Sequence, residues 1–115
     1  ELHSPALEAN RPMRQAVAAF CQAGGVCYAE CGGLMYLART LAVPEPCGAE
    51  ARKVHDMAGV LPFGVTMTKR MTMGYCTATL AEQAAHMLRL PEGTSCRGHV
   101  YHFSQIVVDA AADLC

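Results

Sequence analysis

The chain has 115 residues, of which 52% are hydrophobic, and its 9 Lys and Arg residues nearly balance its 10 Asp and Glu residues. A chain of this length is one domain or part of one. Its basic residues are scattered, and its two adjacent basic pairs are too few for a phosphate-backbone footprint. No apolar run approaches the roughly 20 residues of a membrane span, and no signal segment opens the chain. We therefore expect no nucleic-acid partner, no membrane partner and a cytoplasmic location.

The first element in chain order is a predicted helix over residues 10–24. Asn10 suits the N-cap, and Pro12 falls in the first turn, where its missing N–H costs nothing. Apolar residues recur at steps of three and four, which predicts one buried stripe made of Met13, Ala16, Val17 and Phe20. Gly24 is expected to end the helix in a left-handed conformation.

The next segments predict a strand, a sharp turn and a second helix. A short apolar run over residues 26–29 is bounded by glycines and predicts a buried strand. Strong helix formers over residues 34–41 predict a helix, and Glu30-Cys31-Gly32-Gly33 stands between them. We name these four residues the Cys31 turn. The order of elements indicates an α/β domain with a parallel or mixed sheet flanked by helices.

The rest of the chain is predicted from turn residues and β-formers. The expected elements are a loop over 43–56, a short strand over 57–61 ended by Pro62, one or two strands over 65–80 broken at Gly74, a short helix over 81–90, a turn at Pro91-Glu92-Gly93, and a strand over 99–108.

The Cys31 turn carries the clearest chemical signal. A nucleophile on a tight strand-to-helix turn is held in a strained backbone conformation, with its side chain raised from the sheet edge. Glycines behind it let a substrate approach, and a helix N-terminus or a nearby histidine lowers the pKa of a thiol. The Gly32 N–H would then stabilise an oxyanion. A small buried cysteine before a glycine turn is the alternative interpretation, and the pattern alone leaves both open.

The base for such a nucleophile must come from elsewhere, and the strand over 99–108 holds two histidines. Side chains alternate along a strand, so His99 and His102 point to opposite faces and only one can face the sulfur. A structural role is the alternative for each. The spacings Cys96-x2-His99-x2-His102 and Cys27-x3-Cys31 also suggest a metal site. His99 and His102 lie on opposite strand faces, however, which does not suit tetrahedral coordination of one ion. We therefore expect no metal. The six cysteines other than Cys31 are expected to be reduced fillers or loop residues.

Residues 28–37, Tyr-Ala-Glu-Cys-Gly-Gly-Leu-Met-Tyr-Leu, resemble the nucleophile signature of cobyrinic acid a,c-diamide synthases and their hydrogenobyrinic acid and nickel-sirohydrochlorin relatives. Further pieces of the chain follow the order of that family: residues 1–14, residues 57–75, and the second catalytic motif at residues 97–104. The resemblance covers nearly the whole chain except the loop over 43–54.

The resemblance implies a flavodoxin-like class I glutamine amidotransferase domain, present in part. In that family Cys31 would attack the glutamine side chain, form a thioester and release ammonia, and His102 would act as base and acid. Gly32 and Gly33 would bind the oxyanion or substrate, with Glu30 and Ser104 as supporting residues. Ammonia would pass to a synthetase domain, where ATP and Mg²⁺ activate corrinoid carboxylates for cobalamin biosynthesis.

Two departures from the family bear on activity. The family usually has Glu at the position of Val100, on the same strand face as His102. The chain also begins after the glycine-rich turn that supplies a second oxyanion N–H, and it has no G-x-x-x-x-G-K-[ST] loop. We expect the ATP-binding synthetase domain to lie outside residues 1–115 and no cofactor to bind here. The alternatives are a non-catalytic remnant that only packs against a partner, and a cysteine hydrolase with another substrate.

Overall fold

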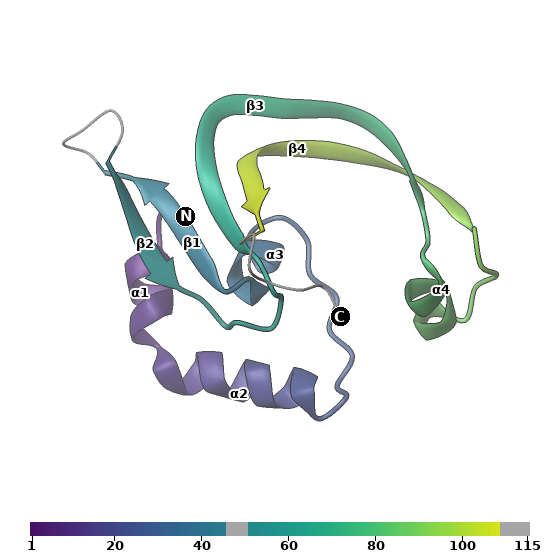
Figure 1. The fold of residues 1–115 in the computed structure, drawn as a ribbon, viewed down its shortest axis with the longest axis horizontal. Coiled ribbons are helices and arrows are strands. Elements are labelled where there is room, and N and C mark those ends of the chain that lie inside the picture. The colour runs from purple at the N-terminus through teal and green to yellow at the C-terminus, as the bar shows by residue number, and fades with distance from the viewer. Residues whose placement is uncertain (46–50, 109–115) are drawn as a thin grey trace. The chain divides into compact units, whose positions relative to one another are not determined.

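The structure is a computed structural model that describes residues 1–45 and 51–108. It divides into two compact units, and each is described by itself. The first unit is Glu1–Arg70 together with the chain from Phe103 onward, and the second is Met71–His102. The elements, labelled in Figure 1, are α1 (Ser4–Ala9), α2 (Arg11–Gln22), α3 (Gly32–Leu37), β1 (Thr40–Pro44), β2 (Arg52–Asp56), β3 (Gly64–Thr79), α4 (Glu82–Leu88) and β4 (Ser95–Val107).

The described residues form a mixed sheet of four strands in the order β2-β1-β3-β4. β1 pairs antiparallel with β2, with Thr40 opposite Asp56, and parallel with β3, with Leu41 opposite Val65. A parallel pair needs a crossover connection, and β2 and the loop after it fill that role between β1 and β3. This mixed sheet with helices confirms the expected α/β class.

Helix α2 begins and ends close to where the sequence predicts. The Asn10 side chain accepts a hydrogen bond from the Met13 N–H at 3.3 Å, which confirms Asn10 as the N-cap. Gly24 has φ = 85°, the left-handed conformation expected of a residue that ends a helix. The predicted buried stripe is wrong, because Met13 and Phe20 are 52% and 55% exposed and α2 buries none of its residues. Within the part of the chain that the structure describes, no element covers that face of the helix.

Residues 26–29 were predicted to form a strand, and this prediction is wrong. The segment belongs to no helix or strand, and Val26 and Tyr28 are 71% and 83% exposed. A strand exists only through hydrogen bonds to a neighbouring strand. The described residues provide no neighbour here, so the apolar run has no ladder to join.

Helix α3 is shorter than predicted because a loop takes up its C-terminal carbonyls. It ends at Leu37 instead of residue 41, and the chain turns at once into β1. The expected strand over 57–61 is wrong for the same reason. Three N–H groups of this segment donate to carbonyls at the end of α3, each at 2.9 Å: Ala58 to Tyr36, Gly59 to Ala38 and Val60 to Leu37. Orphan carbonyls at a helix end need such donors, and this segment satisfies them instead of pairing as a strand.

The predicted loop over 43–56 is also partly wrong, because its two ends lie in strands. Thr40–Pro44 forms β1 and Arg52–Asp56 forms β2, paired from Thr40–Asp56 to Pro44–Arg52. Prolines and charges in this stretch indicate a loop, yet Pro44, Arg52 and Lys53 are exposed residues of the paired strands β1 and β2. Residues 46–50, which carry the centre of the predicted loop, lie outside the described residues.

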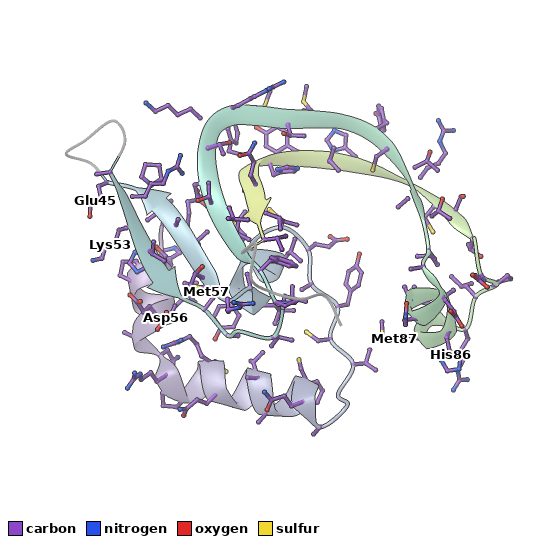
Figure 2. The ribbon with its side chains drawn as sticks, in the orientation of Figure 1. Glu45, Lys53, Asp56, Met57, His86 and Met87 are labelled. Atoms are coloured by element: carbon purple, nitrogen blue, oxygen red, sulfur yellow. The ribbon has the colours of Figure 1, made fainter. Side chains whose placement is uncertain are left out.

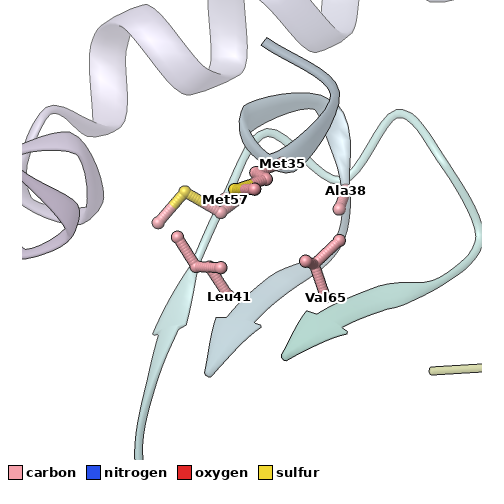
Figure 3. Close-up of a cluster of buried hydrophobic side chains, with 5 residues drawn as sticks. All are labelled: Met35, Ala38, Leu41, Met57 and Val65. Carbon is pink, nitrogen blue, oxygen red and sulfur yellow. The ribbon is translucent and has the colours of Figure 1, made fainter. Parts of the chain in front are cut away.

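The core of the first unit is small and lies between α3 and the sheet. Its buried side chains come from α3, β1, β3 and the residues that follow α3 and β2, as Figure 3 shows: Met35, Ala38, Leu41, Met57 and Val65. Leu41 is 2% exposed and Ala38 is fully buried. This cluster holds α3, and therefore the Cys31 turn at its start, against the sheet.

The second unit is formed by parts of β3 and β4 with α4 between them. Its predicted elements are confirmed: a strand, the short helix α4, a turn at Gly93 with φ = 75°, and β4, which starts four residues earlier than expected. The predicted break at Gly74 is wrong, because β3 continues through this residue from Gly64 to Thr79. The rings of Tyr75 and His99 meet edge to face across the two strands, with centroids 5.4 Å apart. Figure 2 labels His86 and Met87 on α4.

Candidate active site

Cys31 is the N-cap residue of α3 and has a backbone conformation that few residues with a side chain adopt. Its φ is 50° and its ψ is −114°, which lies in the positive-φ region favoured by glycine. Such a conformation costs about 1–3 kcal/mol and persists only where the surrounding structure imposes it. The thiol side chain is exposed. The strain expected of a nucleophile on a sharp turn is present at this residue.

The two glycines after Cys31 have different surroundings. A Cβ placed on Gly32 would meet no atom within 4 Å, whereas a Cβ on Gly33 would lie 3.3 Å from the Ala29 Cβ. The Gly33 N–H donates to the Glu30 carbonyl at 2.8 Å, so it is already used inside the turn. Gly32 therefore has open space around it, and Gly33 allows close packing of the turn.

Tyr28 is a residue that sequence reasoning gave no role. Its hydroxyl donates a hydrogen bond to the Glu30 carboxylate, and that bond, together with the negative charge, raises the pKa of the Tyr28 hydroxyl. Both side chains lie just before Cys31 in the chain. A tyrosine two residues before an acid in an extended segment shares its face, and this spacing was the available signal. The bond restrains the Glu30 carboxylate at the first residue of the Cys31 turn.

The alternation expected along β4 is confirmed. Val100, His102 and Ser104 are half-buried, while His99, Tyr101 and Phe103 are exposed. His102 therefore points to the more enclosed face of the strand, and Val100 and Ser104 share that face. His102 is not without an interaction partner in the structure. His99, on the other face, packs against Tyr75 and lines a shallow pocket with Arg97 and Gly98.

The structure brings part of the predicted site together. Glu30, Cys31, Gly32 and Gly33 form one continuous turn in the first unit. His102 belongs to the second unit, and Ser104 is on the part of β4 that belongs to the first. Cys31 and both glycines therefore lie together in the first unit, and His102 is assigned to the second.

The other described cysteines do not fill the core. Cys21 is half-buried in α2, whereas Cys76 and Cys96 are exposed residues of β3 and β4, so the expectation of fillers or loop residues is wrong for Cys76 and Cys96. Cys27 lies in an irregular segment, as a loop residue would. Cys47 and Cys115 lie outside the described residues. Among residues 1–45 and 51–108, no group of three or more His, Cys, Asp or Glu side chains is arranged to hold a metal ion.

Within the same described residues, none of the helices is long and apolar enough to cross a membrane.

Comparison with known proteins places the chain in a family. A family model described as the CobB/CobQ-like glutamine amidotransferase domain matches residues 1–115. A cobyrinate a,c-diamide synthase of Syntrophotalea carbinolica is 40% identical over 97% of the chain, and one of Salmonella typhimurium has the same identity and coverage. A hydrogenobyrinate a,c-diamide synthase of Streptomyces coelicolor is 34% identical over 97% of the chain.

The chain spans only 23% of the length of the first two relatives and 20% of the third. The family model that matches the whole chain describes a glutamine amidotransferase domain, in agreement with the signature at residues 28–37. The chain therefore belongs to the family of CobB/CobQ-like glutamine amidotransferase domains.

Proposed function

We propose that this chain hydrolyses glutamine through a thioester on Cys31, with His102 as the base, and delivers ammonia for the amidation of corrinoid carboxylates. The observation that carries the proposal is the strained backbone of Cys31 at the start of α3, in a chain that matches the amidotransferase family over its full length. Strain of this kind at an exposed thiol costs stability, and a nucleophile explains why it is kept.

The first step of the proposed reaction is attack by the Cys31 sulfur on the amide carbon of the glutamine side chain. His102 takes the thiol proton, and the carbonyl oxygen becomes an oxyanion that the Gly32 N–H stabilises. Collapse of this intermediate transfers the proton from the His102 ring to the amide nitrogen, and ammonia leaves. The product is a γ-glutamyl thioester on Cys31.

The second step releases glutamate. His102 takes a proton from water, which attacks the thioester carbon, and the Cys31 sulfur leaves with a proton returned by His102. The open space around Gly32 suits both steps, because substrate and water must reach the sulfur from outside. Glu30, whose carboxylate accepts a hydrogen bond from the Tyr28 hydroxyl, is a supporting residue within the turn.

We assign the ATP-dependent amidation of the corrinoid to residues outside this chain. The three relatives are named for amidation of cobyrinate or hydrogenobyrinate, and the chain covers at most 23% of their lengths. The chain contains no phosphate loop of the G-x-x-x-x-G-K-[ST] type. ATP and Mg²⁺ would therefore act on residues outside this chain, and the present residues would supply ammonia alone.

Covalent labelling tests the proposal directly. A glutamine analogue that carries a chloroketone or diazo group should add to Cys31 and leave Cys76 and Cys96, which are equally exposed cysteines of the same chain, unlabelled. The labelling should be done on the chain alone and on the chain fused behind the preceding segment of the Salmonella typhimurium relative. Peptide mapping by mass spectrometry locates the adduct.

Two variants separate the proposed activity from its alternatives. Cys31→Ser should abolish glutamate release, and His102→Ala should lower its rate by about 10²–10⁴-fold, the usual contribution of general acid–base catalysis. His99→Ala, on the opposite strand face, is the matched control. An unlabelled Cys31 in the fused protein would favour the non-catalytic remnant. Labelling of Cys31 by other electrophilic amides, without glutaminase activity, would favour a hydrolase with another substrate.

A further inference from the structure

A pocket of about 330 Å³ lies between α2 and the end of β2, within the first unit. The α2 residues that line it stand three or four positions apart along one face of the helix: Arg11, Arg14, Gln15 and Ala18. The other lining residues are Asp56, which ends β2, and Met57 and Ala58, which follow it. Figure 2 labels Asp56 and Met57 at the end of β2 nearest α2. None of these residues belongs to the Cys31 turn or to β4.

The guanidinium group of Arg14 is fixed by the protein and keeps donors for a ligand. Its Nε donates to the Glu8 carbonyl at 3.1 Å, and its Nη1 donates to the Met57 carbonyl at 3.0 Å. A planar guanidinium held by two such bonds has little freedom left, so its remaining N–H groups keep one orientation. Within the described part of the chain, Nη2 has no hydrogen-bond partner. Arg14 therefore presents a preorganised donor to the pocket that it lines.

Two further charges, of opposite sign, line the same pocket. Arg11 and Asp56 are exposed, and neither side chain has a hydrogen-bond or ion-pair partner among residues 1–45 and 51–108. The Asp56 backbone is nevertheless fixed, because its N–H donates to Glu8 Oε1 at 2.9 Å. The lining thus carries one more positive than negative charge. Opposite charges that line one pocket without pairing leave room for a ligand that contacts both.

We propose that this pocket binds an acidic α-amino acid, with its two carboxylates at Arg11 and Arg14 and its ammonium group at Asp56. Such a ligand carries one more negative than positive charge and so complements the lining. Guanidinium and carboxylate groups form the strongest charge-assisted hydrogen bonds between side-chain types, often through two parallel N–H bonds. The site uses neither Cys31 nor His102, so it is independent of the proposed function.

The remaining lining residues suit the uncharged part of such a ligand. Met57 and Ala58 are buried, at 3% and 9% exposed, and with Ala18 they give the pocket an apolar surface for the methylene groups. The Gln15 side chain adds an amide that can donate or accept a hydrogen bond. An apolar surface with a few converging polar groups is the usual composition of a small-molecule site.

The three charges also predict which similar molecules the pocket rejects. L-Glutamine has the ammonium group but only one carboxylate, so one guanidinium would lose its partner. Glutarate has both carboxylates without the ammonium group, and Asp56 would then face an anion with no cation between them. Each loss removes a hydrogen bond to a charged group. We expect L-glutamate to bind about tenfold to a hundredfold more tightly than either molecule.

A titration of the full chain followed by NMR tests the site without any activity measurement. The titrations use Cys31→Ser, so that L-glutamine is not converted to L-glutamate if the proposed function holds. L-Glutamate should shift the methyl signals of Ala18 and Ala58, and the shifts should saturate. Shifts confined to residues 30–33 would place the ligand at the Cys31 turn and overturn the proposal. An affinity for L-glutamate weaker than about 10 mM would overturn it as well.

Substitutions at the two unpaired charges give the matched comparisons, and Arg14 is left unchanged because its bonds support the fold. Asp56→Asn should lower the L-glutamate affinity about tenfold or more and make glutarate the better ligand. Arg11→Gln should lower the L-glutamate affinity by a similar factor and narrow the preference over L-glutamine. Arg89→Gln, an exposed arginine at the end of α4, changes the net charge equally and should alter neither affinity. If Asp56→Asn still prefers L-glutamate to glutarate, the proposal is wrong.

Discussion

Glu8 of α1 and His55 of β2 lie 47 residues apart in the chain and meet with Oε2 and Nδ1 2.7 Å apart. His55 is 1% exposed, and the other Glu8 oxygen accepts the Asp56 N–H at 2.9 Å. Arg14 of α2 adds two bonds, from Nε to the Glu8 carbonyl at 3.1 Å and from Nη1 to the Met57 carbonyl at 3.0 Å. Figure 2 labels Asp56 and Met57 at the end of β2, where these bonds join the N-terminal helices to the sheet.

Acid should weaken the attachment of α1 to β2. The Asp56 N–H first, and then the His55 side chain, lower the pKa of the Glu8 carboxyl in the folded chain. A folded pKa below the unfolded one stabilises the fold above the ordinary value of about 4.3, and this stability is lost as the pH falls through the folded value. Thermal unfolding by circular dichroism should show a melting temperature that drops with pH below about 4.3.

The variant Glu8→Gln should melt lower at neutral pH and lose less stability on acidification. Glu92→Gln, in the turn before β4, is the control and should reproduce the wild-type pH dependence. If Glu8→Gln retains the full acid-dependent drop, the Glu8 carboxyl is not the group that links pH to stability.

The side chain of Leu41 should be the most sensitive position of the core. It is 2% exposed and packs with Met35, Met57 and Val65 between α3 and the sheet (Figure 3). Leu41→Ala removes buried methyl groups and leaves a cavity, which costs about 2–5 kcal/mol in the free energy of unfolding. Val54→Ala on β2, whose side chain is 58% exposed, should change it by less than about 0.5 kcal/mol. Urea unfolding measures both, and equal losses would contradict this assignment of the core.

The two glycines of the Cys31 turn should respond differently to alanine. A methyl group at Gly32 meets no atom outside its two chain neighbours, so Gly32→Ala should keep the fold and fill only open space next to the residue that follows Cys31. We expect its glutaminase kcat/KM to fall by roughly tenfold to a hundredfold, since misplacement of a substrate by an ångström has costs of that order. Gly33→Ala meets Ala29 at 3.3 Å and should lower the melting temperature as well. Equal activity of Gly32→Ala and wild type would argue against substrate approach on that side.

The residue at position 100 should tune the proposed base. Val100 and His102 are both half-buried on one face of β4, and residues two apart on a strand lie about 7 Å from each other. Val100→Glu would restore the carboxylate that the family usually has and favour the protonated imidazole. We expect a severalfold rise in glutaminase kcat and an acid limb of the pH–rate profile at higher pH. Val100→Gln, of the same shape without the charge, is the control and should show neither change.

Local signals in the sequence determined several elements and the sharp bend of one turn. The limits of α2 follow from the Asn10 side chain and the left-handed Gly24, which act on neighbouring backbone groups whatever the rest of the chain does. The α4 helix, the turn at Gly93 and the alternation along β4 are local in the same sense. The Cys31 turn could be predicted because a residue before two glycines at a helix start implies a sharp bend.

Only the tertiary structure decided which backbone groups found partners. Residues 26–29 and 57–61 are both short apolar runs, yet neither forms a strand: the first has no neighbour among the described residues, and the second donates its N–H groups to the end of α3. The pairing of Glu8 with His55 likewise depends on the path of the chain between α1 and β2. Hydrogen bonds between segments depend on where those segments meet in space, which periodicity along the chain does not encode.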